Sequence, residues 1–168
     1  YLNENKVIGW FQGGSEIGPR ALGNRSILAN PKSQWMTHYV NEIKEREWYR
    51  PFAPSVLYEN QSKVFELDTY SPYMLVTSQV KSNWKKKIPA VTHIDGTSRY
   101  QSVTESNNPR YHKLISDFYK LSKIPLVMNT SFNGPSEPIV ETPRNAIDTF
   151  LRQGLHYLII GNYLVFRK

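Results

Sequence analysis

Basic side chains stand beside glycine, proline or small polar residues in four short segments of the sequence. The first, Gly-Pro-Arg-Ala-Leu-Gly-Asn-Arg-Ser at residues 18–26, places Arg20 and Arg25 around a loop punctuated by glycine. Arginine side chains and exposed backbone amides can together hold phosphate oxygens. The segment has neither a Walker A ending nor the glycine fingerprint of a dinucleotide fold. Spacing alone therefore supports a tight turn with solvated arginines at least as well as an anion site.

The second segment, residues 44–54, carries three cations, among them Lys44 and Arg50, and two prolines. The prolines fix φ and stiffen the segment, which limits how far the neighbouring cations can move. The alternative is a helix end whose cations complement the helix dipole, an effect of about 1 kcal/mol each at most. We favour an anion site here, because rigid backbone and arginines able to form paired hydrogen bonds occur together.

The third segment, residues 93–101, is a turn that leads into a strand. Arg99 and Gln101 are two residues apart, so a strand would point both side chains to the same face. An ordinary Asp-Gly hairpin explains the same residues, and spacing alone favours that alternative.

The fourth segment, residues 129–134, places Thr130, Ser131 and Asn133 at the end of an apolar strand. Ligands often bind at such strand ends in open α/β sheets. Composition alone supports a polar turn equally well.

Several other chemistries lack their sequence patterns. The chain contains no cysteine, and its four histidines show neither H-x-x-x-H nor H-E-x-x-H spacing. We therefore predict no transition metal held by this chain. A G-x-S-x-G elbow is absent as well, which disfavours a serine hydrolase.

Length and charge limit the possible partners. The 168 residues, 39% hydrophobic and 21% charged, suit one globular domain with a buried core. The formal net charge of +7 predicts attraction to nucleotides, phosphates or nucleic acid, without choosing among them. No apolar run approaches the roughly 20 residues that span a bilayer, and no signal-peptide pattern is present. We expect a soluble, cytoplasmic protein, and the absence of a first methionine indicates a fragment of a longer one.

Hydrophobic periodicity predicts an α/β domain with a mixed sheet. We expect strands at residues 6–11, 26–29, 55–58, 73–80, 99–103, 126–129, 157–160 and 163–166. Gly161-Asn162 should close the last two strands into a hairpin. Residues 84–87, Trp-Lys-Lys-Lys, should form a solvated loop.

Three helices are expected to pack on this sheet. The first follows Ser33 as its N-cap and ends before Pro51, and the second follows Asn108-Pro109. The third begins at Thr142-Pro143 and ends at Gly154.

Five stretches, taken in order, resemble the carboxy-terminal domain of the NodU/CmcH carbamoyltransferase family. They are GPRALGNRSILA at 18–29, RPFAPSVL at 50–57, PAVTHIDGTSR at 89–99, NTSFN at 129–133 and EPIV at 137–140. The resemblance spans nearly the whole chain. It implies a YrdC-like fold, in which a twisted mixed sheet is flanked by helices.

The resemblance also implies an activity. In complete members of the family this domain forms carbamoyl-adenylate from carbamoyl phosphate and ATP, with Mg²⁺ as the expected ion. An amino-terminal domain with its own metal site then moves the carbamoyl group to a hydroxyl. That domain would be the partner of this chain within a longer polypeptide.

Residue roles follow by motif position within the resemblance. Lys44 and Arg50 match basic residues that hold phosphates, and Arg99 matches an arginine that we assign to the carbamoyl donor. Ser131, Asn133 and the neighbouring Thr130 match the small polar nucleotide loop, and Arg20 and Arg25 are weaker matches. The chain departs from the family at Ser136, where relatives commonly have glycine before the glutamate.

Two functions of other classes stay open at this point. Net charge suits a module that binds RNA or DNA, whose affinity would fall steeply with salt. A catalytically silent domain that docks against the missing half is the other. The sequence identifies neither the hydroxyl acceptor nor the oligomeric state.

Overall fold

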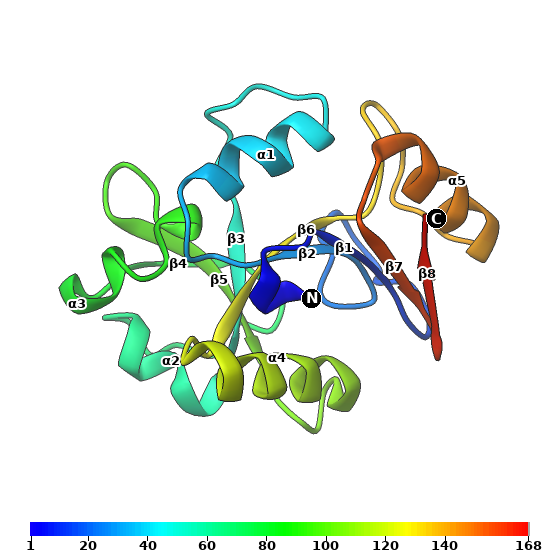
Figure 1. Cartoon of the computed structure of the whole chain (residues 1–168). Helices are drawn as coiled ribbons and strands as arrows, with labels where there is room; N and C mark the ends of the chain where they lie inside the picture. Colours follow the sequence, from blue (N-terminus) through cyan, green and yellow to red (C-terminus); the bar gives the residue numbers. More distant parts are fainter. Residues whose placement is uncertain (168) are drawn as a thin grey trace.

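Within residues 1–167, which a computed structural model describes, eight strands form a single mixed sheet (Figure 1). The strand order is β4-β5-β3-β6-β2-β1-β7-β8. The strands are β1 (Ile8–Phe11), β2 (Arg25–Ala29), β3 (Ala53–Leu57), β4 (Val76–Gln79), β5 (Thr97–Val103), β6 (Leu126–Ser131), β7 (Tyr157–Ile160) and β8 (Tyr163–Phe166). The pairs β1–β7 and β3–β5 are parallel and the other pairs are antiparallel. The predicted mixed sheet is confirmed.

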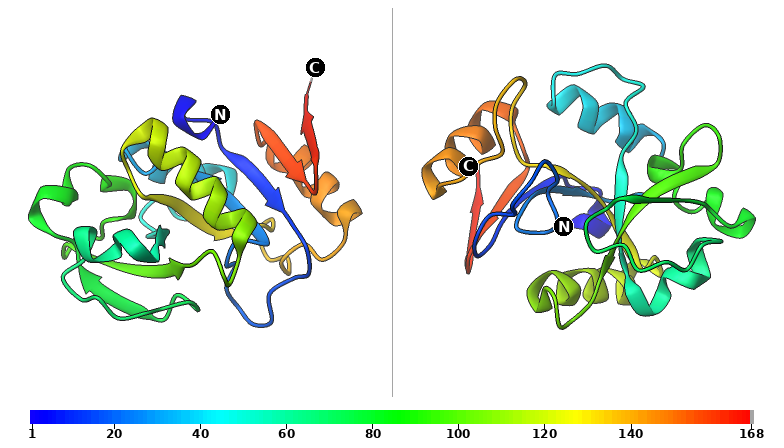
Figure 2. Two further views of the ribbon diagram at one scale, coloured as in Figure 1. Left: turned by 90° about the horizontal axis from the view of Figure 1, so that it is seen from below. Right: turned by 180° about the vertical axis from the view of Figure 1, so that it is seen from behind.

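Helices cover this sheet from both sides, as the three views in Figures 1 and 2 show. They are α1 (Trp35–Ile43), α2 (Tyr58–Val64), α3 (Ser82–Lys85), α4 (Pro109–Ser122) and α5 (Pro143–Gln153), with short 3₁₀ turns at Leu2–Glu4 and Pro89–Val91. Helix α4 packs against β3 and β6, and α2 packs against β3 and β5. Helix α1 lies on the opposite side of the sheet, and α5 packs against β1 and β7. No helix in residues 1–167 is long and apolar enough to cross a membrane.

Local capping explains the helices that the sequence predicted well. Asn108 Oδ1 accepts a hydrogen bond from the Tyr111 backbone N–H at 3.1 Å and so begins α4. Thr142 and Asn145 form a reciprocal capping box at the start of α5. Gly154 ends α5 with φ +66°, in the left-handed region that glycine tolerates. The hairpin of β7 and β8 also has the predicted bounds.

Other local predictions were wrong. Ser33 does not cap α1, because Gln34 occupies the N-cap and makes no side-chain capping bond. Tyr58 belongs to α2 rather than to the strand before it. Met74 has φ +57°, so the extended strand predicted for 73–80 is shortened to β4. Residues 82–85 form α3 instead of a solvated loop, because the Trp84 side chain is buried.

The register of the central strands brings distant loops to one end of the sheet. Strand β3 is antiparallel to β6 and parallel to β5, with Ala53 opposite Asn129 and Ser55 opposite Gln101. Strand β2 is also antiparallel to β6, with Ser26 opposite Ser131. The chain therefore enters β2, β3 and β5, and leaves β6, at the same end of the sheet. The four segments singled out in the sequence meet there.

Candidate active site

A pocket of about 760 Å³ opens between two loops at this end of the sheet. One loop follows α1 and the other follows β6, and Figure 1 shows them facing each other above the middle of the sheet. The residues that line the pocket are Glu42, Lys44, Glu45, Arg46, Glu47, Arg50, Ser131, Asn133, Gly134, Pro135 and Ser136. Four predicted site residues, namely Lys44, Arg50, Ser131 and Asn133, thus share one cavity.

The Lys44 ammonium group is enclosed by oxygen atoms of the β6 loop. Its side chain is buried, and Nζ donates to Ser131 O at 2.7 Å, Asn133 O at 3.0 Å and Asn133 Oδ1 at 2.6 Å. Burial, and secondarily the charge of Arg46, lower the pKa of Lys44 to about 7. Burial disfavours the charged form and the oxygen acceptors favour it, so we expect Lys44 to exchange between ammonium and amine near neutral pH. An incoming anion would stabilise that charge.

The β6 loop is held in shape by its own hydrogen bonds. Ser131 Oγ donates to Asn133 Oδ1 at 2.7 Å, and Asn133 Nδ2 donates to Glu137 O at 2.7 Å. Gln153 Nε2, at the end of α5, donates to Asn133 O at 2.9 Å. Ser136 has φ +56°, a backbone conformation that favours glycine. The polar atoms around Lys44 are therefore fixed before any ligand binds.

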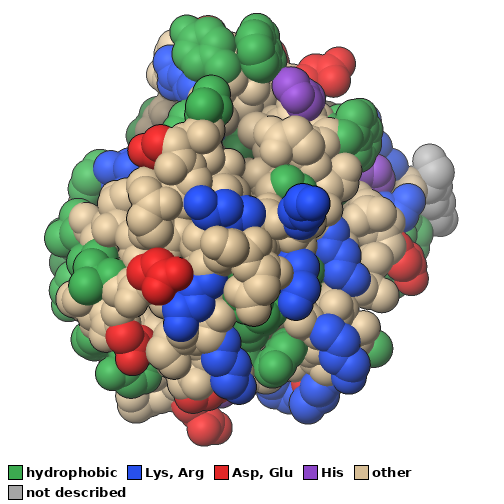
Figure 3. All heavy atoms as spheres, turned by 90° about the vertical axis from the view of Figure 1, so that its left-hand side faces the viewer, with side chains coloured by type: hydrophobic (Ala, Val, Ile, Leu, Met, Phe, Trp, Pro, Cys, Tyr) green, Lys and Arg blue, Asp and Glu red, His purple; other side chains and the backbone are tan. Residues whose placement is uncertain are grey.

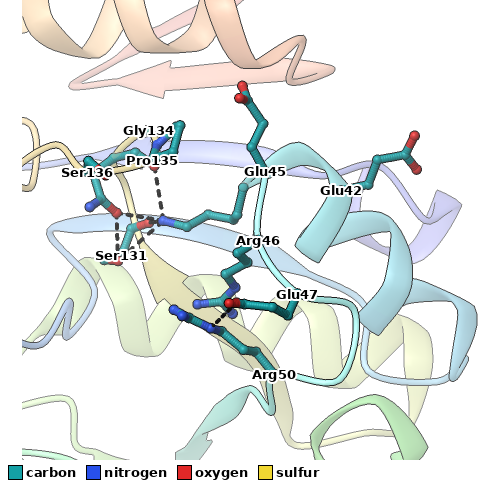
Figure 4. A pocket seen from close by; sticks show the side chains of 11 residues that line it. Glu42, Glu45, Arg46, Glu47, Arg50, Ser131, Gly134, Pro135 and Ser136 are labelled. Atoms are coloured by element: carbon teal, nitrogen blue, oxygen red, sulfur yellow. Dashed lines mark hydrogen bonds and ion pairs between the residues drawn. The ribbon is translucent and has the colours of Figure 1, made fainter.

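Two arginines form the lower side of this pocket in Figure 4. The Arg46 and Arg50 side chains lie side by side there, whereas Glu42 and Glu45 point away from them. Arg46 Nε donates to Asn41 Oδ1 at 2.6 Å, and burial together with Arg50 lowers the pKa of Arg46 to about 10. Arg50 is half exposed and pairs with Glu47 at 2.6 Å. Such an exposed pair adds little stability, so Arg50 is free to turn toward an anion.

A second, smaller pocket of about 120 Å³ adjoins the first. Arg20, Arg99 and Thr130 line it, and it shares Arg46 and Ser131 with the larger pocket. Burial and the nearby Arg20 charge lower the pKa of Arg99. The Nε atoms of Arg20 and Arg99 are buried without a hydrogen-bond partner among the described residues. Two cations that repel each other and keep unused donors would be stabilised by an anion between them.

Arg25 does not join these residues, although the sequence offered it as a site residue. Its side chain is buried and donates to the backbone oxygens of Gln12 at 2.8 Å and Gly13 at 3.1 Å. The guanidinium carbon lies 3.6 Å from the centre of the Phe11 ring. Arg25 lines neither of the two pockets as they are described in residues 1–167. Its contacts fix the start of β2.

The positive net charge is visible on the face of the molecule drawn in Figure 3. Lys and Arg side chains gather in the middle of the face seen in Figure 3, which carries the β4 and α3 end of the sheet. Residues 1–167 contain no group of three His, Cys, Asp or Glu side chains that could hold a metal ion. The arrangement thus suits anions whose charge is balanced by lysine and arginine.

Comparison with known families gives this geometry a context. A family model described as carbamoyltransferase C-terminus matches residues 1–167. The chain belongs to this carbamoyltransferase family. It is 44% identical over 172 residues to nodulation protein NolNO of Sinorhizobium fredii, a match that covers all of this chain and 25% of the relative. It is 45% identical over 132 residues to nodulation protein U of Rhizobium tropici, covering 79% of this chain and 23% of that protein.

The carbamoyltransferase relatives are much longer than this chain. The chain spans 25% and 31% of the lengths of NolNO and of the NolO protein of Bradyrhizobium diazoefficiens. The match therefore concerns one domain of these relatives and not the activity, substrates or partners of the whole proteins.

Solved structures show the same fold at low sequence identity. Full-length HypF in its phosphate- and nucleotide-bound form matches with a TM-score of 0.62 and 18% identity, over 96% of this chain and 24% of HypF. Sua5 of P. abyssi, complexed with L-threonine, matches with a TM-score of 0.66 and 14% identity, over 96% of this chain and 44% of Sua5. The predicted YrdC-like fold of the carbamoyltransferase C-terminus is confirmed.

Sequence reasoning gave no site role to Arg46, which lines both pockets, or to Gln101, which lines neither but binds the loop that carries Arg20. Arg46 joins the two pockets, and its position between Lys44 and Arg50 in the second segment was the available signal. Gln101 was noted only for sharing a strand face with Arg99. Its hydrogen bonds become visible only in three dimensions.

Proposed function

We propose that this chain is the adenylate-forming domain of an O-carbamoyltransferase, which makes carbamoyl-adenylate from carbamoyl phosphate and ATP. The observation that carries the proposal is the pair of adjoining cationic pockets of unequal size. The larger one contains Lys44 and Arg50, the smaller one contains Arg20 and Arg99, and Arg46 lines both. A large polyanion and a small anion that must react together need such a pair of neighbouring sites.

Membership of the carbamoyltransferase family supports this reaction class. The likeness to HypF, a protein solved with phosphate and nucleotide bound, supports nucleotide binding on this fold. Neither relative fixes the individual residue roles, which rest on the geometry of the pockets.

The proposed reaction joins carbamate to AMP. Carbamoyl phosphate first reacts with water to give carbamate and inorganic phosphate. A carbamate oxygen then attacks the α-phosphorus of ATP, the bond to the bridging oxygen breaks, and pyrophosphate leaves. Negative charge accumulates on the phosphoryl oxygens during this step, and fixed cations lower its energy. The chain therefore needs only to position the substrates and to stabilise the charge on the phosphoryl oxygens. It forms no covalent intermediate with them.

Each predicted site residue except Arg25 takes one role in this scheme. Lys44 and Arg50 bind phosphates of ATP, and Ser131, Thr130 and Asn133 supply hydrogen bonds to the nucleotide. Arg99, assisted by Arg20, binds the carbamoyl donor. These roles use side chains that line the two pockets.

Magnesium enters the proposal as the ion that accompanies ATP. Mg²⁺ prefers oxygen ligands and is commonly bound through substrate phosphates with one or two carboxylates. Glu47 lines the larger pocket but pairs with Arg50, and residues 1–167 contain no acidic cluster for a dedicated site. We therefore assign the ion to the phosphates of ATP.

We further propose that the chain works beside an amino-terminal domain of the same polypeptide, because its relatives are three to four times longer. That domain would carry its own metal and transfer the carbamoyl group to a hydroxyl. A reactive adenylate needs protection from water, so the two domains should act together. We propose that both are cytoplasmic.

The test uses the full-length protein that contains this chain. It is incubated with carbamoyl phosphate, ATP, Mg²⁺ and candidate hydroxyl acceptors, and AMP and carbamoylated product are measured by mass spectrometry. Arg50→Ala should abolish AMP formation without unfolding the domain. Arg144→Ala is a matched control, because Arg144 forms a comparable exposed pair with Asp148 on α5, outside both pockets. Equal turnover in Arg50→Ala and the control would refute the proposal.

Binding measurements separate the other two functions from this one. A nucleic-acid module would bind RNA or DNA with steep salt dependence and show no preference for ATP among triphosphates. A silent docking domain would bind no ATP in calorimetry with Mg²⁺ present.

A further inference from the structure

Three buried polar side chains on the central strands form a connected group beneath the smaller pocket. Ser55 Oγ donates to Gln101 Oε1 at 2.6 Å, and Asn129 Nδ2 donates to Ser55 Oγ at 2.9 Å. The group also reaches outward to the loop before β2. Gln101 Nε2 donates to Leu22 O at 2.8 Å, and Asn129 Nδ2 donates to Ala21 O at 3.0 Å. We call Ser55, Gln101 and Asn129 the amide clamp.

The amide clamp holds the two backbone carbonyls that directly follow Arg20. The amide side of the same loop is held separately, because Glu16 Oε1 accepts hydrogen bonds from Leu22 N at 2.8 Å and Asn24 N at 2.6 Å. Side chains thus bind both carbonyl and amide groups of the loop. A glycine-containing loop would otherwise be free to adopt many conformations.

The restraint on this loop is important because the loop places the Arg20 guanidinium close to that of Arg99. Arg20 and Arg99 line one small pocket, and their mutual repulsion contributes to the lowered pKa of Arg99. Without a ligand, that repulsion would favour conformations in which the Arg20 loop moves away from Arg99. Gln101 lies two residues after Arg99 on β5, so one strand positions Arg99 directly and Arg20 through the loop.

We propose that Gln101 is a positioning residue, which through the amide clamp keeps the Arg20 guanidinium opposite Arg99 for binding of a small oxyanion. The orientation of its amide follows from the hydrogen bonds, because the Leu22 carbonyl accepts only from a donor nitrogen. The identity of that anion as the carbamoyl donor rests on the proposed function. The restraint on the loop does not.

The first measurement compares Gln101→Met with Gln61→Met in the full-length protein. Gln61 is a matched control, since its buried amide donates to Asp68 Oδ1 at 2.8 Å and accepts from Ser102 Oγ at 2.6 Å, away from the loop. Both variants should lower the melting temperature. Only Gln101→Met should raise the KM for carbamoyl phosphate, by roughly ten- to a hundredfold, while the KM for ATP changes much less.

The second measurement asks whether Gln101 acts through Arg20. In an Arg20→Ala background, Gln101→Met should produce little further increase in the KM for carbamoyl phosphate, because the positioned group is already gone. A full, independent increase in that background would overturn the proposal.

The third measurement needs no catalytic activity. Hydrogen exchange followed by mass spectrometry should be faster across residues 18–24 in Gln101→Met and unchanged there in Gln61→Met. Unchanged exchange in Gln101→Met would overturn the amide clamp.

If the wild type forms no AMP but exchange responds as expected, the proposed function fails and the clamp stands. Should Gln101→Met not fold, Gln101→Glu replaces it, because a carboxylate keeps the acceptor for Ser55 but lacks the donor to Leu22.

Discussion

Binding of ATP should make this protein take up a proton at Lys44. In the ligand-free chain, burial and the Arg46 charge lower the pKa of Lys44 to about 7, so the side chain is half protonated at that pH. The phosphates of ATP would add negative charge beside Nζ and raise this pKa again. Because only the protonated form attracts phosphate, affinity should fall as pH rises above 7.

The size of this effect follows from the two pKa values. If the phosphates restore the pKa of Lys44 from about 7 to its ordinary 10.5, ATP affinity should fall about fiftyfold between pH 7 and 9. Proton uptake on binding should be about half a proton at pH 7 and about 0.9 at pH 8. A terminal phosphate with a pKa near 6 is already largely ionised over this range, so it contributes little.

Isothermal titration calorimetry in buffers of different ionisation enthalpy measures the number of protons taken up. Lys44→Met should bind ATP weakly and remove the uptake, whereas Lys113→Met, which changes an exposed lysine on α4, should leave both unchanged. An uptake below about 0.1 proton at pH 8 in the wild type, or equal uptake in Lys44→Met, would refute the reasoning.

Three further predictions concern the same region. Arg99→Lys keeps the charge but loses the forked donors of the guanidinium, so steady-state kinetics should show about a tenfold higher KM for carbamoyl phosphate and a smaller change for ATP. Gly23→Ala should lower the free energy of unfolding by about 3 kcal/mol in urea titrations, because φ is +108° and the new methyl would clash with the Tyr111 ring. Gly14→Ala, where a methyl meets nothing within 4 Å and φ is ordinary, should change it little. In the ligand-free chain, unfolding returns the pKa of Lys44 from about 7 to its ordinary 10.5, so the unfolded chain binds one more proton between these pH values. The free energy of unfolding, measured in urea titrations, should therefore rise with pH from about 7 to 10.5. The rise should be smaller in Lys44→Met.

The elements that the sequence predicts well are those with local signals. Helix α4 begins at Asn108-Pro109, where the cap and the proline are adjacent in sequence. Helix α2 was missed because two of its buried residues, Asn60 and Gln61, are polar and break the apolar periodicity. The partners that satisfy Gln61, such as Ser102 on β5, are distant in sequence. Long-range hydrogen bonds of this kind produce no periodic pattern in the sequence.

The candidate site was likewise predictable from the sequence only where the signals are local. Residue type and spacing identified the cationic and polar segments. In the fold, Lys44 donates to Ser131 O and both residues line the larger pocket. The same reasoning could not separate Arg20 from Arg25, because both flank one glycine loop. Only packing decides that Arg25 turns inward over Phe11 while Arg20 lines a pocket.

The order of strands has a consequence for how the chain is made. Strand β1 is synthesised early but lies between β2 and β7, and Ile8 pairs with Tyr157. Lys44 finds its oxygen acceptor on Ser131 only 87 residues later in the chain. Pairing over such separations is slow and follows emergence of the later strand from the ribosome. A nascent chain that stops before β6 has no anion pocket, so substrates can stabilise the finished domain but cannot guide its early folding.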